Sequence, residues 1–202
     1  MADQRQGLLF FGTMAASLSH EMRNALATVS ETSGLMADIM EMAAEEGNDV
    51  DPEKLRSLCQ RIATQSKRAA GLAGRLNAFA HTVDEEHAAV DLRTHIALAV
   101  ELNRRKASLE RVDLDNGELA DGPEITCDPF ALHLLLHQVF MASVRRCGTE
   151  ANLQVDLEPS GDIRIRGLAE KPEGLPESLA RAALDLGFAP SLESGALRLK
   201  RS

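Results

Sequence analysis

Two long series of apolar residues at helical spacing constrain the fold of this chain more than any other feature. Between residues 7 and 46, and again between residues 51 and 86, these positions recur at intervals of three and four. The first series comprises Phe11, Met14, Leu18, Met22, Ala25, Val29, Thr32, Met36, Ile39 and Ala43. The second comprises Leu55, Leu58, Ile62, Gln65, Ala69, Leu72, Leu76, Phe79 and Val83. Such spacing predicts two long helices, each with one face packed in a bundle.

A short break joins the two predicted helices into a hairpin. Gly47-Asn48-Asp49-Val50 interrupts the first helix, and Asp51-Pro52 suits the start of the second, because Asp is a good N-cap and Pro fits the first helical position. A lone hairpin cannot bury a continuous apolar stripe, whereas a homodimer can bury it in a four-helix bundle. We therefore expect residues 1–88 to form a dimerisation hairpin.

Residues 89–202 have a different pattern, in which short helices alternate with short strand-like segments. We expect helices at 92–104, 129–146 and after Pro176, and strands at 110–114, 124–127, 153–157, 163–166 and 196–200. This order predicts a small α/β sandwich with helices over a mixed sheet. The expected fold class of the whole chain is α+β.

Composition narrows the class of protein further. The formal net charge is −9, so binding to nucleic acid would need a segregated basic patch, and we expect none. No apolar stretch reaches the length of about 20 residues that spans a bilayer. The three widely spaced cysteines suit buried or partly buried thiols in a reducing compartment. We expect a cytoplasmic protein without a metal site. His133 and His137 have metal-ligand spacing, but a pair on a helix surface is the simpler interpretation.

The first helix carries one histidine in a distinctive setting. At about 100° per residue, His20 lies on the far side from the apolar series, with Asn24 one turn further on and Glu21 between His20 and that series. A neutral imidazole is a nucleophile at physiological pH, and a nearby carboxylate can hold one ring N–H so that the other nitrogen stays free. From spacing alone, an ordinary exposed histidine explains the pattern more simply.

The residues around this histidine resemble a known motif. Ser19-His20-Glu21-Met22-Arg23-Asn24-Ala25-Leu26 is similar to the phosphoacceptor box of sensor histidine kinases, S-H-E-[LIM]-R-[TN]-P-L. The resemblance covers residues 7–88, and its departure is Ala25, where the family usually has a proline that kinks the helix.

This resemblance implies a role for each of four residues. His20 would be phosphorylated, and Glu21 would be its acid/base and orienting partner. Asn24 would help to place a water when the protein acts as a phosphatase. Arg23 would steady the phosphoryl group or contact a partner, although a solvated helix charge explains it equally well.

The second half resembles the ATP-binding domain of histidine kinases with its nucleotide motifs altered. Counting from Asp128-Pro129, the two asparagines of the family's N-box correspond to His137 and Met141, and a thioether is no ligand for Mg²⁺. The family's D-x-G-x-G-I-P box corresponds to residues 170–176, with Glu at its first position and Pro at its first glycine. We therefore expect residues 89–202 to be a degenerate ATPase-like domain without a cofactor, as in ChpT-type phosphotransferases.

The resemblance implies a histidine phosphotransferase of a two-component phosphorelay. It would carry a phosphoryl group on His20 between response-regulator receiver domains, which would supply Mg²⁺. Two alternatives stay open, a receiver phosphatase that uses Glu21 and Asn24, and a non-catalytic pseudokinase or adaptor. An active kinase with an unusual ATP site is the least favoured.

Overall fold

The computed structural model describes residues 2–148, 150–169 and 174–201 and divides the chain into two compact units. The first unit spans Met1–Ala78 and the second Phe79–Ser202. The two units therefore meet between residues 78 and 79, whereas the sequence places the domain boundary between residues 88 and 89. Within the described part of the chain, no helix combines the length and the apolar character that crossing a membrane requires.

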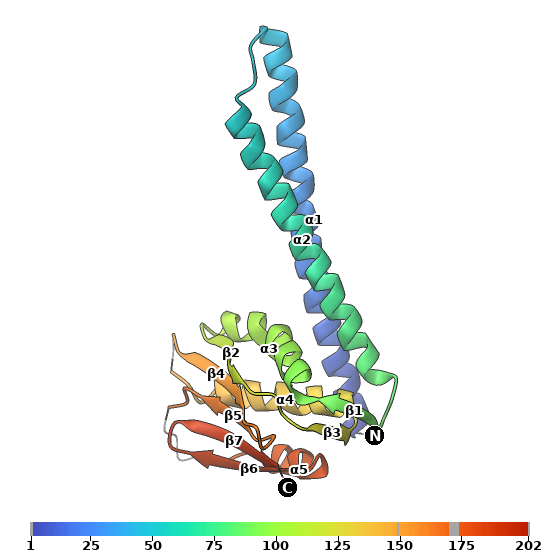
Figure 1. Ribbon diagram of the computed structural model, residues 1–202, viewed down its shortest axis with the longest axis vertical. Coiled ribbons are helices and arrows are strands. Elements are labelled where there is room, and N and C mark those ends of the chain that lie inside the picture. Colours follow the sequence, from blue (N-terminus) through green and yellow to red (C-terminus); the bar gives the residue numbers. More distant parts are fainter. Residues whose placement is uncertain (1, 149, 170–173, 202) are drawn as a thin grey trace. The chain divides into compact units, whose positions relative to one another are not determined.

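The first unit is a hairpin of two long helices, α1 (Ala2–Glu46) and α2 (Pro52–Ala80), which run side by side (Figure 1). Gly47 ends α1 in the left-handed region with φ +68°, which favours glycine. Asp51 caps α2, since its Oδ1 accepts from the Glu53 N–H at 2.9 Å. The predicted break and restart are confirmed.

Burial follows the two predicted apolar series. Met14, Leu18, Ala25 and Thr32 of α1 are buried, as are Leu58, Ala69, Leu72 and Phe79 of α2. Most other members of the two series are half-buried. A second set of large apolar side chains on α1 stays exposed, including Leu8, Leu26, Leu35, Met40 and Met42. The hairpin therefore covers one face of α1 and leaves further apolar surface open.

The end of α2 differs from the prediction. The helix ends at Ala80 rather than near residue 86, and a 3₁₀ turn, η1 (His81–Val83), follows it. The Thr82 hydroxyl donates to the Phe79 carbonyl at 2.7 Å, and His81 Nδ1 lies 2.6 Å from Asp84 Oδ2. These local bonds compete with the hydrogen bonds that would extend α2 beyond Ala80. Val83, which was predicted to lie on the apolar face of the helix, is 51% exposed.

The second unit contains three α-helices, the 3₁₀ turn η1 and seven strands among its described residues. The helices are α3 (Leu92–Leu109), α4 (Pro129–Val144) and α5 (Glu177–Asp185). The strands are β1 (Ala88–Asp91), β2 (Asp113–Leu119), β3 (Glu124–Cys127), β4 (Asn152–Leu157), β5 (Ile163–Arg166), β6 (Phe188–Glu193) and β7 (Ala196–Arg201). The α+β fold class is confirmed.

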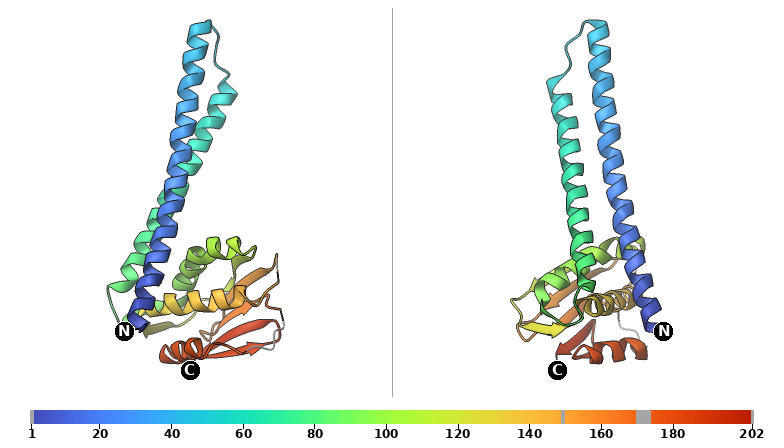
Figure 2. Two further views of the ribbon diagram at one scale, coloured as in Figure 1. Left: turned by 180° about the vertical axis from the view of Figure 1, so that it is seen from behind. Right: turned by 90° about the vertical axis from the view of Figure 1, so that its right-hand side faces the viewer.

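The main sheet is mixed, as predicted. Its strand order is β2-β4-β5-β7-β6, with β2 and β4 parallel and the other neighbours antiparallel, while β1 and β3 form a separate antiparallel pair. Helices α3, α4 and α5 form one layer against this sheet (Figure 2). Alternate residues of β4, β5 and β7, such as Val155, Ile165 and Leu197, are fully buried in the core between the two layers.

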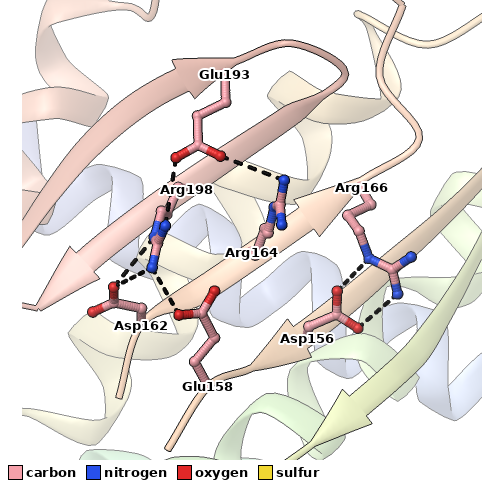
Figure 3. A network of polar contacts seen from close by, with 7 residues as sticks. All are labelled: Asp156, Glu158, Asp162, Arg164, Arg166, Glu193 and Arg198. Carbon is pink, nitrogen blue, oxygen red and sulfur yellow. Dashed lines mark hydrogen bonds and ion pairs between the residues drawn. The ribbon is translucent and has the colours of Figure 1, made fainter. Parts of the chain in front are cut away.

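The opposite face of the sheet carries charged side chains in place of a second helical layer. Asp156 pairs with Arg166, and Arg198 pairs with Asp162 at 2.8 Å and Glu158 at 2.7 Å (Figure 3). Asp156, Arg166 and Arg198 lie on β4, β5 and β7, and Glu158 and Asp162 lie in the turn between β4 and β5, so ion pairs link neighbouring parts of the sheet across this face. This face of the sheet is therefore polar, and the charged residues named here are paired with one another.

Three strands and one cysteine differ from what the sequence predicts. Strand β2 was predicted at 110–114 but begins at Asp113 and ends at Leu119. Strand β1 was not predicted, and neither was β6, which contains Pro190 and lies at the edge of the sheet, where a proline is tolerated. Cys59 was expected to be buried or partly buried, but it is exposed, with its Sγ 3.9 Å from Met36 Sδ.

Candidate functional site

His20 projects from the open face of α1. Its side chain is exposed, whereas Leu18 and Ala25 on the other side of the same helix are 4% and 2% exposed. Helix α1 continues without interruption past Ala25 to Glu46, because alanine keeps the backbone N–H that a proline would lack. The sequence prediction of an imidazole displayed on a continuous helix is confirmed.

Asn24 is the residue that contacts the imidazole ring. Its Nδ2 lies 3.3 Å from His20 Nδ1, one helical turn away. This contact is compatible with both neutral tautomers of His20. When the ring proton is on Nε2, the Asn24 amide donates to Nδ1. When the proton is on Nδ1, the Asn24 amide group is rotated by half a turn and its oxygen accepts from Nδ1–H. In the second arrangement Nε2 of this exposed residue carries the lone pair, which suits a nucleophile. The Asn24 amide can therefore stabilise the reactive tautomer.

Glu21 faces the second helix of the hairpin. Its Oε2 lies 3.7 Å from Arg68 Nη2 of α2, and its side chain is only 16% exposed, against 58% for Arg68. The carboxylate of the residue that follows His20 in the sequence therefore has a cation beside it. Arg68 could not be identified from the sequence, because the spacing within α2 does not reveal which of its turns lies beside Glu21.

The four residues singled out from the sequence thus have different surroundings. Asn24 contacts His20, Glu21 pairs with Arg68, and Arg23 is exposed on α1. Their proposed chemical roles stay predictions, since geometry gives position and not reactivity. The arrangement provides a nucleophilic nitrogen, a group that can fix its tautomer, and charges of both signs within one turn of helix.

Histidines of the second unit are placed very differently. His133 of α4 is 1% exposed, and its Nε2 lies 3.1 Å from His95 Nδ1 of α3. The Phe79 ring meets the His133 ring edge-on, with centroids 6.1 Å apart. Burial, and then the neighbouring His95, lower the pKa of His133 to about 3. The expectation that His133 is on the helix surface was therefore wrong.

His137 is held by a fixed chain of hydrogen bonds. Asn103 donates from Nδ2 to the Ala99 carbonyl at 2.8 Å, so its Oδ1 must face His137 Nδ1, which lies 2.5 Å away. The ring proton is therefore on Nδ1. Burial first, and the charges of Lys106 and Arg145 next, lower the pKa of His137 to about 4. Among the described residues, no three potential metal ligands gather in one place.

Comparison with known proteins gives structural likeness only. No family model and no curated protein matches the sequence. The cytoplasmic segment of histidine kinase QseC is 20% identical, with a TM-score of 0.49 over 67% of this chain and 93% of that one. Acinetobacter baumannii histidine kinase AdeS is 12% identical, with a TM-score of 0.44 over 91% and 97%.

A third solved structure is histidine kinase ThkA in complex with response regulator protein TrrA. It is 15% identical, with a TM-score of 0.44 over 96% of this chain and 62% of that one. All three of these solved structures contain a histidine kinase or its cytoplasmic segment. At these scores the roles of individual residues rest on the geometry of the chain itself.

Proposed function

We propose that this chain is a histidine phosphotransferase of a two-component phosphorelay, with His20 as the phosphoacceptor. The observation that supports this most is the exposed His20 imidazole on a continuous helix, with Asn24 at 3.3 Å from its Nδ1 and the histidine-kinase-like box around it. Its partners are receiver domains of response regulators. The setting is the cytoplasm, and neither nucleic acid nor a membrane takes part.

The transfer step needs little from this chain beyond a positioned nucleophile. The Nε2 lone pair of His20 attacks phosphorus of an aspartyl phosphate on a docked receiver, forming a P–N bond. The P–O bond to the aspartate breaks, and its electron pair leaves on the aspartyl carboxylate. The proton on Nδ1 stays in the ring, held by Asn24 Oδ1. The receiver supplies Mg²⁺, and the reverse step delivers the phosphoryl group to a second receiver.

Several residues argue against transfer from ATP. Met141 stands at a position where the related kinases have a magnesium-binding asparagine, and its side chain is 9% exposed. A buried thioether offers no hard oxygen ligand. Glu170 and Pro172, which replace an aspartate and a glycine of the family's next box, lie outside the described residues. We infer that the α/β unit is a degenerate ATPase-like domain of the ChpT type.

A homodimer is part of this proposal. Leu8 and Leu26, 70% and 52% exposed, lie eighteen residues apart on α1, which is about five turns of helix, so they fall on one line. Exposed apolar side chains beside a buried apolar face suit a second hairpin and a four-helix bundle. Sedimentation at micromolar concentration should give the mass of two chains. A monomer in that experiment would remove the dimer from the proposal.

The function is tested with phosphorylated receiver domains. We would mix ³²P-labelled receivers, and in parallel labelled ATP, with the wild type and with His20→Gln. Acid-labile label should reach the wild type from a receiver but not from ATP, and the variant should take up none while keeping its oligomeric state. Transfer to the variant would refute the role of His20. Direct labelling from ATP would mean that the chain is a kinase.

The position of Asn24 favours one second candidate, a receiver phosphatase. An amide one turn from His20 can direct a water toward an aspartyl phosphate as readily as it can orient the ring. In the same experiment, rapid release of inorganic phosphate without label on the protein would favour this activity. Label on His20 would favour transfer.

A further inference from the structure

Helix α2 contributes a charged residue to a site that otherwise belongs to α1. Arg68 Nη2 lies 3.7 Å from Glu21 Oε2, a distance that allows charge pairing but is longer than a hydrogen bond. The Glu21 side chain is 16% exposed and the Arg68 side chain 58%. The carboxylate is thus the covered and restricted member of the pair, and the guanidinium is the exposed one.

This pairing matters because of the charge on the incoming group. A phosphoryl group carries nearly two negative charges at pH 7, and Glu21 adjoins its acceptor, His20, in the sequence. An uncompensated carboxylate there would repel the phosphoryl group as it approaches. A cation within 4 Å of the carboxylate offsets that repulsion, and the effect is strongest when a docked receiver excludes water.

We propose that Arg68 is a positioning residue for phosphoryl transfer to His20, acting through Glu21. It neutralises the carboxylate and holds it against the hairpin, so that the face of the imidazole is open to a dianionic donor. This inference rests on the proposed phosphotransferase function and adds a residue of α2 to its machinery. Because the contact is longer than a hydrogen bond, the positive charge of Arg68 matters more than its fork of N–H donors.

The test is the rate of single-turnover transfer from a saturating phosphorylated receiver. Arg68→Gln should slow the transfer about tenfold, while Arg68→Lys, which keeps the charge, should restore most of the rate. Lys67→Gln removes the same charge from the exposed neighbouring residue and should leave the rate within about twofold. The binding constant for the receiver should change less than the rate constant.

A double-mutant cycle tests whether Arg68 acts through Glu21. In the Glu21→Gln background there is no carboxylate to neutralise, so Arg68→Gln should change the residual rate by less than about twofold. An equal loss in both backgrounds would overturn the inference, as would failure of Arg68→Lys to restore the rate. If Arg68→Gln transfers like the wild type, this inference fails alone. If the wild type accepts no label from any receiver, the proposed function fails and the inference fails with it.

Discussion

His20 and His133 both project from helices, yet their surroundings are opposite. His20 is exposed on α1 with an amide at 3.3 Å, while His133 is 1% exposed on α4 and touches Phe79 and His95. His133 Nδ1 has no hydrogen-bond partner in the part of the chain that the structure describes. A docked protein can reach the first ring, but the second ring is closed off by packing.

The ion pairs of the two units also differ, in how strongly their partners are held. The Glu21–Arg68 pair of the hairpin is 3.7 Å long and has an exposed cation. In the α/β unit, Asp156 binds Arg166 through both carboxylate oxygens, one of them 2.9 Å from Nη2, and also accepts from the Glu118 N–H at 2.9 Å (Figure 3). Bidentate, charge-assisted bonds of this kind restrict both partners strongly.

This contrast separates polar groups that are available for chemistry from those that stabilise the fold. Around His20, the imidazole, Asn24 and Arg68 can change partners when another protein docks. Around His133 and Asp156, loss of a present partner would leave a covered polar group without its hydrogen bond, which costs about 1–3 kcal/mol. The two units should therefore respond differently to acid and to substitution.

The largest expected effect is on the acid stability of the α/β unit. His133 has a folded pKa of about 3 and an ordinary unfolded pKa near 6.5. Below pH 6.5 the unfolded chain takes up a proton that the folded chain rejects, so stability falls as the pH is lowered. The loss is about 1.4 kcal/mol per pH unit and about 5 kcal/mol in total by pH 3. Above pH 6.5, His133 adds no pH dependence.

Urea unfolding between pH 4 and 7 measures this slope. His133→Leu should reduce the slope by about 1.4 kcal/mol per pH unit, since leucine has no proton to take up. The matched control is His87→Leu, which removes an exposed histidine and should leave the slope unchanged. An unchanged slope in His133→Leu would mean that His133 is protonated in the folded chain, and the contrast with His20 would then disappear.

Much of the fold could be predicted from periodicity. The two apolar series identified the faces of α1 and α2 that are buried, and the Asp51-Pro52 and Asp128-Pro129 pairs marked two helix starts at the correct residues. Strands β3 and β5 were predicted with their observed bounds. These features depend on local spacing and capping, which a sequence displays directly.

What the sequence could not provide depends on contacts between distant segments. Arg68 belongs to the site only through the pairing of α1 with α2, which brings it beside Glu21. His133 was assigned to the helix surface because it is polar and paired with His137, and only the packing of α3 and Phe79 against α4 shows that it is buried. Strand β6 is paired to β7 at a sheet edge. It was not predicted, because Pro190 argues against a strand unless that strand lies at an edge.

A smaller change in stability is expected when one charge is removed from either of the two ion pairs. Asp156→Asn removes the charge that Arg166 binds, and the side chain is only 13% exposed, so we expect a loss of about 2 kcal/mol in the free energy of unfolding at pH 7. Hydrogen bonding from Arg166 is the main cause that lowers the pKa of Asp156, and burial opposes it. The stability that the ionised Asp156 carboxylate contributes is therefore present above pH 4 and is lost as the pH falls through the pKa of Asp156 in the folded chain. The difference between wild type and variant should shrink below pH 4.

Arg68→Gln, measured by the same urea unfolding, should change the free energy of unfolding by no more than about 0.5 kcal/mol, because the guanidinium is exposed and its contact with Glu21 is longer than a hydrogen bond. Asp113→Asn, at an exposed aspartate of β2, serves as the control for Asp156. If Arg68→Gln destabilised the hairpin as much as Asp156→Asn destabilises the sheet, Arg68 would be a structural residue. A slow transfer rate in that variant would then reflect a damaged helix pair. A near-zero change in stability, together with slow transfer, would assign Arg68 to the chemistry at His20.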